Sequence, residues 1–572
     1  MTNPPEHRPE DWWHRATVYQ IYPRSFQDSN GDGVGDLQGI IARLDHLARL
    51  GIEVLWLSPI YRSPMVDNGY DISDYRDIDP VFGTLSDFDE LLEQAHRRGI
   101  KVMMDLVVNH SSDQHPWFQA SREKDSPYRD WYFWRPARPG LTPGAPGSEP
   151  DDGAGAFAPR NWHFDPASGE YYYGLFSPGQ PDLNWENPAL RQAVYELMRF
   201  WVERGVDGFR MDVINLISKP QAMTQGEVVA PGSSHWYAVA NGPRLDEFLA
   251  EMNQQVGLKR LNLLTVGEMP GSTLDVARRA TDPAHNELNM VFTFEHVDLD
   301  QSPDGSKWDL APHRLVPFKQ NLAHWQEGLA EAGWNSLYLD NHDQPRAVSR
   351  FGDDSPAHRV SSAKTLATVL HLHKGTPYVY QGEELGMTNF PFRSIDDYQD
   401  VESLNHHRLA LAAGQDEAQV LQALATKGRD NARTPVQWDD SPHAGFTTGE
   451  PWLAVNPNHM EINAAAQLDD PDSVFHHYRR LIALRKSDPT VVHGRFELLA
   501  PEHEQLWAFT RTLDGDRLLV LANCSSNPLD LGSVGLPCAE GAELVLGVNV
   551  SDDPHRMNPW ESRVLRLPRE QA

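Results

Sequence analysis

The chain has 572 residues, enough for an α/β barrel of about 250 residues together with an insertion and a second domain. Its formal net charge of −31 argues against nucleic acid and against an anionic membrane surface as partners, and its two cysteines, Cys524 and Cys538, exclude a disulfide framework. The N-terminus has no basic and apolar leader and no apolar run is long enough to span a bilayer, so we expect a cytoplasmic protein without a membrane partner.

Short apolar and β-branched runs predict eight strands that are buried on both faces. These runs lie at Ala16–Tyr22, Val54–Leu57, Lys101–Val107, Gly208–Asp212, Leu263–Val266, Met290–Phe294, Ser336–Leu339 and Pro377–Tyr380. Helical periodicity falls between them, for example at Leu37–Leu50, Leu85–Arg98 and Leu190–Arg204. Alternating strands and helices are typical of a parallel sheet, and eight such units predict a closed (β/α)8 TIM barrel of the α/β class.

Two stretches depart from this alternation. Residues 109–184, after the third strand, lack clear helical periodicity and are rich in Pro, Gly, Trp and Tyr. They predict an inserted, loop-rich domain that overhangs the barrel rim. Residues 381–438 form a second, irregular extension, and from residue 489 short alternating runs predict a C-terminal antiparallel β domain. The predicted barrel is therefore divided between residues 1–108 and 185–488, and the β domain spans residues 489–572.

Acidic residues follow several of the predicted strands. Asp212 ends the fourth, Glu268 follows the fifth, and Asp343 follows the seventh. Taken singly, each could cap a helix or accept a backbone hydrogen bond. The carboxyl ends of barrel strands form one rim, however, so we expect the three side chains to converge there, as the carboxylates of glycoside hydrolases do. Arg210 points to the same face as Asp212 and favours its ionised form.

The segments around these residues resemble the signatures of the α-amylase superfamily, glycoside hydrolase family 13. The matching segments are Asp105–His110, Gly208–Asp212, Val266–Glu268 and Leu339–Asp343. The resemblance implies that Asp212 is the nucleophile, Glu268 the acid/base and Asp343 the transition-state stabiliser of a retaining mechanism. It also implies that His110, Arg210 and His342 surround the same sugar subsite.

Finer features resemble the oligo-1,6-glucosidase branch of that family. The segment Gln180-Pro181-Asp182-Leu183-Asn184 is similar to the marker of this branch. In the loop of residues 63–71, Asp67 is expected to clamp the non-reducing end of the substrate together with Arg429, which makes an exo-acting pocket. Tyr70 offers a face for sugar stacking and Phe176 is a weaker candidate for the same pocket, with core packing as the alternative for both.

The residue after the nucleophile, Val213, bears on linkage. In enzymes that this chain resembles, valine at this position accompanies α-1,6 cleavage, whereas alanine or threonine accompanies α-1,4 cleavage. We therefore predict a retaining exo-α-glucosidase that releases glucose from isomalto-oligosaccharides. An α-1,4-preferring α-glucosidase, a glucosyltransferase or isomerase such as trehalose synthase or sucrose isomerase, and a non-catalytic relative remain alternatives. The intact carboxylates argue against the last. The oligomeric state is left open.

The loop after the first strand alternates oxygen-bearing side chains, as a calcium loop does. Asp28, Asn30, Asp32 and Asp36, with the carbonyl of Val34, would supply the oxygen ligands that a hard cation prefers. The twelfth position of the loop is a glycine instead of a bidentate glutamate, so this is not an EF-hand. The loop resembles the metal site of the same branch, which implies structural Ca2+, with Mg2+ as the alternative.

Overall fold

The computed structural model describes residues 11–224, 239–302, 306–532, 534–537 and 539–569. Cys538 lies outside the described residues. Within them, no helix combines the length and the apolar character needed to cross a membrane.

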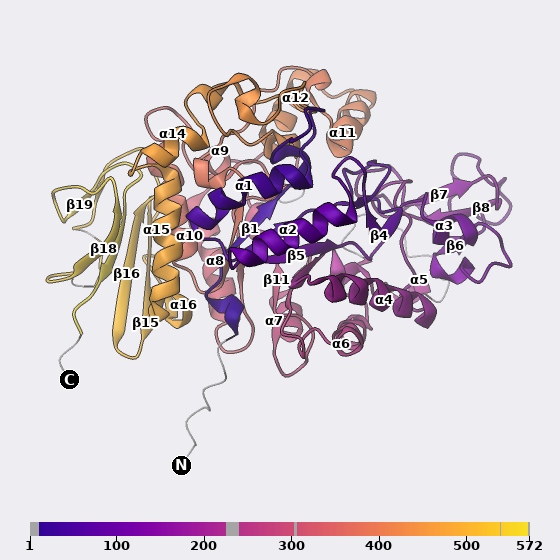
Figure 1. Ribbon diagram of the computed structural model, residues 1–572, viewed down its shortest axis with the longest axis horizontal. Coiled ribbons are helices and arrows are strands. Elements are labelled where there is room, and N and C mark those ends of the chain that lie inside the picture. Colours follow the sequence, from indigo (N-terminus) through magenta and orange to yellow (C-terminus); the bar gives the residue numbers. More distant parts are fainter. Residues whose placement is uncertain (1–10, 225–238, 303–305, 533, 538, 570–572) are drawn as a thin grey trace, which may run out of the picture.

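Eight parallel strands form the barrel at the centre of the molecule (Figure 1). They are β1 (Val18–Ile21), β2 (Val54–Leu57), β5 (Lys101–Leu106), β9 (Gly208–Met211), β10 (Leu264–Glu268), β11 (Met290–Phe292), β12 (Ser336–Leu337) and β13 (Thr376–Tyr380). Their order in the sheet is β11-β10-β9-β5-β2-β1-β13-β12, and a parallel bridge between Val291 and Asn335 joins β11 to β12 and closes the ring. The predicted TIM barrel is confirmed, with strand bounds within a few residues of those expected.

The long helices between the barrel strands surround the barrel, and helix ends follow from local sequence. The described helices are α1 (Leu37–Leu50), α2 (Leu85–Arg97), α3 (Pro116–Ser121), α4 (Pro188–Arg204), α5 (Gln221–Thr224), α6 (Leu245–Val256), α7 (Leu274–Thr281), α8 (Leu315–Gly328), α9 (Ala347–Phe351), α10 (Arg359–His371), α11 (Val401–Ala412), α12 (Glu417–Lys427), α13 (Asp430–Arg433), α14 (Ala464–Asp469), α15 (Val474–Ser487) and α16 (Pro489–His493). For example, α4 begins after the Asn187 cap with a proline at its first position, and it ends at Gly205 in the left-handed conformation.

The insertion after β5 forms a small unit at the right of Figure 1, built on the antiparallel strands β6 (Trp134–Arg135), β8 (Glu170–Tyr173) and β7 (Trp162–Asp165). Two bridges hold the end of the insertion, one from Asp182 to His110 at its start and one from Leu183 to Tyr132 within it. A second hairpin, β3 (Tyr61–Arg62) with β4 (Asp74–Ile78), flanks the loop of residues 63–73. Both units stand at the carboxyl ends of the barrel strands.

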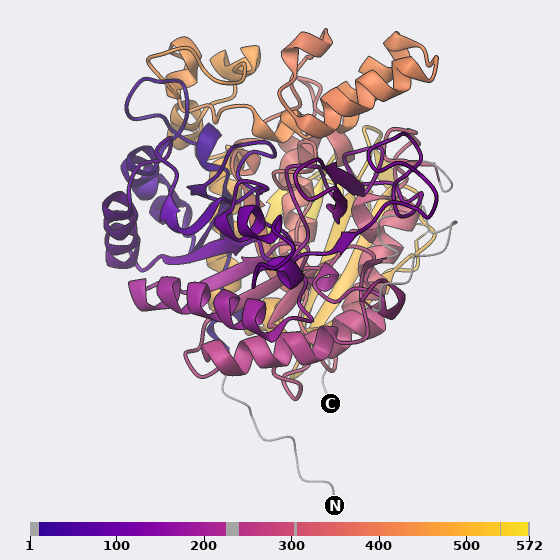
Figure 2. The same ribbon diagram turned by 90° about the vertical axis from the view of Figure 1, so that its right-hand side faces the viewer.

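The extension after β13 is more regular than the sequence suggested. It contains α11 and α12, which lie above the barrel in Figures 1 and 2. Their apolar faces are poorly marked, since α11 exposes Leu404, Leu409 and Leu411, and this explains why periodicity did not reveal them. The capping residues Asp400 and Asp416 were the available signal.

The C-terminal domain begins after α16, a short helix that the sequence analysis did not predict. Its sheet is antiparallel, in the order β14-β15-β16-β20-β18. The strands are β14 (Arg495–Leu499), β15 (Leu506–Leu513), β16 (Asp516–Asn523), β18 (Glu543–Val548) and β20 (Ser562–Arg566), and β17 (Leu529–Asp530) pairs with β19 (Arg556–Met557). This sheet packs beside α8, α10 and α16, away from the rim that carries the insertion (Figure 1).

Candidate active site

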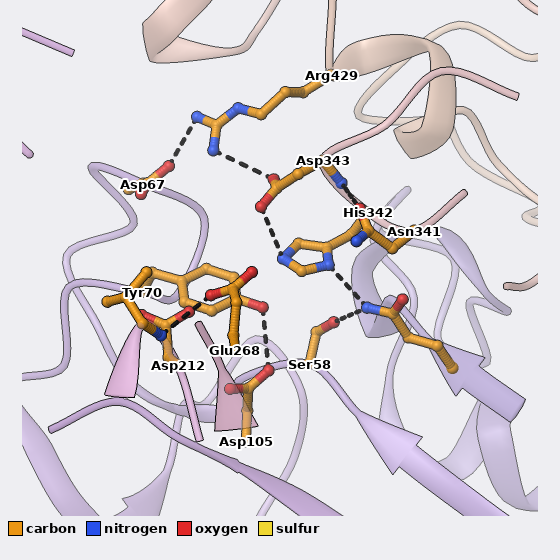
Figure 3. A network of polar contacts seen from close by, with 12 residues as sticks. Ser58, Asp67, Tyr70, Asp105, Asp212, Glu268, Asn341, His342, Asp343 and Arg429 are labelled. Atoms are coloured by element: carbon orange, nitrogen blue, oxygen red, sulfur yellow. Dashed lines mark hydrogen bonds and ion pairs between the residues drawn. The ribbon is translucent and has the colours of Figure 1, made fainter. Parts of the chain in front are cut away.

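The ends of the barrel strands bring three carboxylates to one cavity of about 440 Å³. Asp212 directly follows β9, Glu268 is the last residue of β10, and Asp343 lies in the loop after β12. The same cavity is lined by six other residues that the sequence analysis selected: Asp67, Tyr70, His110, Phe176, Val213 and Arg429. Arg210 and His342 stand behind these lining residues and contact the carboxylates. Figure 3 shows the carboxylates converging from separate elements.

Arg210 is the buried cation at the base of the cavity. Its Nη1 donates to Asp105 at 2.8 Å and to Asp212 at 2.6 Å. Its Nη2 lies 2.6 Å from Oε1 of Glu268. The sequence pairs Arg210 with Asp212 alone, whereas in the structure one guanidinium contacts three carboxyl groups. A single positive charge cannot balance three buried negative charges, so at least one of these groups holds a proton.

Burial and Arg210 act in opposite directions on the two carboxyl groups nearest the reaction centre. Burial raises the pKa of Asp212 well above its ordinary value, and Arg210 opposes that rise. Burial also raises the pKa of Glu268, again opposed by Arg210, while the nearby Asp343 charge adds to the rise. A raised pKa is what a general acid requires. The expected effect of Arg210 on the pKa of Asp212 is therefore present, but burial and the charges of Glu268 and Asp105 oppose it.

Asp343 has the opposite electrostatic setting. Burial would raise its pKa, but the buried guanidinium groups of Arg429 and Arg433 hold that pKa well below the ordinary value, so the group is ionised. Burial lowers the pKa of His342 to about 3, which leaves the imidazole neutral. Nδ1 of His342 lies 2.8 Å from the amide nitrogen of Gln20, and Nε2 lies 3.3 Å from Asp343 (Figure 3).

The backbone at Val213 is strained. Its φ and ψ are 36° and 43°, in the left-handed region that β-branched residues rarely adopt. In this conformation the Val213 N–H donates to Oε2 of Glu268 at 3.0 Å. The side chain is buried and lines the cavity beside the acid/base candidate. The strained turn thus places both the side chain of Val213 and its N–H at the reaction centre.

Asp67 and Arg429 close one side of the cavity. Nη2 of Arg429 donates to Asp67 at 3.0 Å, and Nη1 donates to Asp343 at 3.2 Å (Figure 3). Gln180, from the segment that resembles the branch marker, donates to the other oxygen of Asp67 at 3.2 Å. Asp67, Arg429 and Gln180 therefore form a connected set of polar groups that reaches Asp343.

Tyr70, His110 and Phe176 form the wall next to this clamp. The Tyr70 ring stacks on His342 at 5.2 Å, and its hydroxyl donates to Asp105 at 3.0 Å. His110 donates through Nε2 to the carbonyl of Tyr70 at 3.0 Å, and burial lowers its pKa to about 4. Phe176 packs against His110 at 5.1 Å. Both aromatic candidates thus lie at the cavity surface as well as in the packed interior.

The mouth of the cavity is lined by residues that the sequence analysis did not select. They are Phe157, Phe294, Asp298, Gln301, Ser306, Lys307, Trp308, Gln344 and Glu402, with Gly155 and Ala156. Lys307 forms an ion pair with Glu402 at 2.5 Å, and Trp308 stacks on His406 at 4.6 Å. They come from loops and from α11, outside any recognisable motif, so no sequence pattern selected them.

The predicted metal residues share one loop, and several of their oxygens accept backbone N–H groups. Asp28 accepts from Gly33 at 2.9 Å, and Asp36 accepts from Gly39 at 2.6 Å as the cap of α1. Among the residues that the structure covers, no three His, Cys, Asp or Glu side chains are grouped so that they could hold a metal ion. By chemistry, three carboxylates, one amide and a carbonyl suit a hard cation.

Comparisons with known proteins agree with this geometry. The sequence profile of the α-amylase catalytic domain matches residues 20–494. An oligo-1,6-glucosidase of Parageobacillus thermoglucosidasius is 53% identical over 571 residues, covering 97% of this chain and 99% of the relative. The trehalose-6-phosphate hydrolase of Bacillus subtilis is 50% identical over 90% of this chain and 89% of its own length. The solved structure of an isomaltulose synthase from Klebsiella sp. LX3 has a TM-score of 0.92 and 40% identity, covering 98% of this chain and all of that one.

Proposed function

The chain belongs to the α-amylase family of glycoside hydrolases, and from that premise we propose a retaining exo-α-glucosidase that releases glucose from short α-1,6-linked glucosides. The observation that carries the proposal is a cavity in which the three carboxylates face a side closed by Asp67 and Arg429. A closed end admits a chain terminus and excludes the middle of a polysaccharide, which distinguishes an exo-enzyme from an endo-amylase.

In this proposal the three carboxylates have separate roles. Ionised Asp212 attacks the anomeric carbon while protonated Glu268 gives its proton to the departing glycosidic oxygen, which leaves a covalent glucosyl-enzyme. Glu268, now ionised, takes a proton from water as the water displaces Asp212, so glucose leaves with retained configuration. Asp343 stays negative and stabilises the positive charge that develops on the sugar ring. The low pKa of Asp343 and the raised pKa of Glu268 support the roles of these two groups. For Asp212, whose pKa burial raises, the support is the contact with Arg210 at 2.6 Å, which favours the ionised form.

The preference for α-1,6 linkage rests on two supports. Relatives that are 46–54% identical include proteins named oligo-1,6-glucosidase and glucan 1,6-α-glucosidase. The residue after Asp212 is Val213, the residue type that accompanies α-1,6 cleavage in the enzymes that this chain resembles. Its side chain lines the cavity next to Glu268. We assign linkage selection to this side chain.

Hydrolysis of trehalose 6-phosphate is the second candidate, because a hydrolase of that name is 50% identical to this chain. The charges at the cavity disfavour it. Six lining residues are carboxylates and two are cations: Asp67, Asp212, Glu268, Asp298, Asp343 and Glu402 against Lys307 and Arg429. Each cation is engaged by a carboxylate, Lys307 by Glu402 and Arg429 by Asp67, so a phosphate would meet a net negative field.

A product assay separates the candidates. Isomaltose, maltose, sucrose, trehalose and trehalose 6-phosphate are incubated with the protein, and sugars are followed by chromatography. We expect glucose to appear fastest from isomaltose. Trehalulose or isomaltulose from sucrose would instead identify an isomerase. Asp212→Asn is the control: it should fold normally and lose activity, and near-normal turnover by this variant would refute the nucleophile assignment.

We also propose that the loop of Asp28, Asn30, Asp32, Val34 and Asp36 holds a structural Ca2+ ion. Its donor chemistry supports this, and the loop packs against the segment after residue 446, where Thr447 donates to Asp28. The ion would stabilise the fold and has no part in the chemical steps, since the loop follows β1 and none of its residues lines the cavity.

A further inference from the structure

Two buried arginines converge on Asp343. Arg433 donates through Nη2 to Oδ1 of Asp343 at 2.7 Å, and Arg429 donates through Nη1 to the same oxygen at 3.2 Å. Both guanidinium groups are almost fully buried, with side chains 1% and 5% exposed, and like charges held this close in a dry site repel each other. Some other group must keep them together and aimed at Asp343.

Asp400 occupies the position that does this. Its Oδ1 accepts from Nη2 of Arg429 at 2.5 Å and from Nε at 3.0 Å. The same oxygen accepts from Nη1 of Arg433 at 3.3 Å. Asp400 is fully buried, and the two arginines hold its pKa at about 2 against the effect of burial, so it is ionised at neutral pH. It is absent from the cavity lining and does not reach the substrate space.

The second oxygen of Asp400 fixes the residue to the scaffold. Oδ2 accepts from the backbone N–H of Ser403 at 3.2 Å and so caps the start of α11. The Asp400 N–H in turn donates to Asp430 at 3.0 Å. The Asp400 carboxylate thus joins Arg429, which closes one side of the cavity, to the start of α11. The same helix presents Glu402 to the cavity mouth.

We propose that Asp400 is a positioning residue that acts through Arg429 and Arg433 to orient the terminal-glucose clamp and the stabiliser Asp343. Without its charge, the guanidinium groups would move apart and Arg429 would no longer span Asp67 and Asp343. The inference rests on the proposed α-glucosidase function. Removing the charge of Asp400 should therefore lower the affinity for the terminal glucose by more than changing the cap of another helix in the same extension does.

The test uses Asp400→Asn, which keeps the shape and the capping ability of the side chain but removes its charge. The matched control is Asp416→Asn, because Asp416 caps α12 through Gln419 at 3.1 Å in the same extension and does not line the cavity. The readouts are kcat and KM for 4-nitrophenyl α-glucoside and the inhibition constant of glucose. We expect Asp400→Asn to raise the inhibition constant of glucose and KM at least tenfold, with a smaller change in kcat. Asp416→Asn should leave the inhibition constant and KM unchanged.

A double-mutant cycle distinguishes positioning from a general structural role. In an Arg429→Ala background, Asp400→Asn should raise KM much less than it does in the wild type, because Arg429 is the one of its two arginine partners that contacts Asp67 in the terminal-glucose clamp. Equal effects in both backgrounds would overturn the proposal. If Asp400→Asn does not fold, Asp400→Glu keeps the charge but displaces it by one methylene, and an unchanged glucose inhibition constant there would also overturn it. Failure of the wild type to hydrolyse the 4-nitrophenyl glucoside would instead count against the proposed function.

Discussion

Trimming Val213 should change which linkage the protein prefers. The side chain lines the cavity beside Glu268, so we expect its two γ-methyl groups to limit how the departing sugar can be oriented. Val213→Ala removes both. At about 0.8 kcal/mol for each buried methyl-sized group, the change amounts to about 1.6 kcal/mol, or roughly 15-fold in a ratio of rates. We expect the ratio of kcat/KM for isomaltose to that for maltose to fall by about this factor, within the roughly 10–200-fold range of methylene-scale discrimination.

The assay measures kcat/KM on both disaccharides for the wild type, Val213→Ala and Val213→Thr. Val239→Ala is the matched control, since Val239 is buried to the same 6% exposure in the same apolar cluster but does not line the cavity. It should lower stability and leave the ratio unchanged. A wild type that already prefers maltose, or a Val213→Ala ratio no different from that of Val239→Ala, would refute the assignment of linkage selection to this residue.

Three further outcomes are expected. Because burial raises the pKa of Glu268, the alkaline limb of kcat/KM should lie above the ordinary carboxyl range, and Glu268→Gln should impair isomaltose far more than 4-nitrophenyl α-glucoside, whose leaving group needs no proton. Chelation by EGTA should lower the Tm of the wild type but not that of Asp32→Ala. Identical Tm shifts in the two proteins would show that this loop is not the metal site. Burial raises the pKa of Glu287 to about 8, so its contribution to stability is present below about pH 4 and is lost as pH rises towards 8. Glu287→Gln should therefore raise Tm at pH 8 but not at pH 4, and equal gains at both would contradict this.

The barrel was predictable because its signals are local. Each strand is a short apolar run, and the ends of helices such as α4 are marked by capping residues, here Asn187, Pro188 and Gly205. The residues at the strand ends were predictable because a parallel barrel brings all carboxyl ends to one rim. What escaped prediction depends on distant contacts. Nothing near Arg210 in the sequence indicates that its guanidinium would also hold Asp105 and Glu268.

The residues at the cavity mouth could not be predicted from the sequence for a related reason. Lys307 and Glu402 are separated by 95 residues, and they meet because the extension after β13 folds over the rim. Asp400 carried a visible capping signal, but its link to Arg429 appears only in three dimensions. In the same way, the left-handed backbone of Val213 is imposed by its surroundings and opposes the local preference of valine.

The way in which the barrel closes gives the three carboxylates backbone supports that differ in the extent of strand pairing. Asp212 and Glu268 stand on β9 and β10, each of which is flanked by paired strands on both sides. Asp343 follows β12, a two-residue strand that pairs with β13 and meets β11 through the bridge of Val291 to Asn335. Local opening of a fold begins where backbone pairing is sparse, so amide hydrogens along this seam should exchange before those of β9. Asp212 and Glu268 thus stand on well-paired backbone, whereas Asp343 depends on Arg429 and Arg433 to hold it in place.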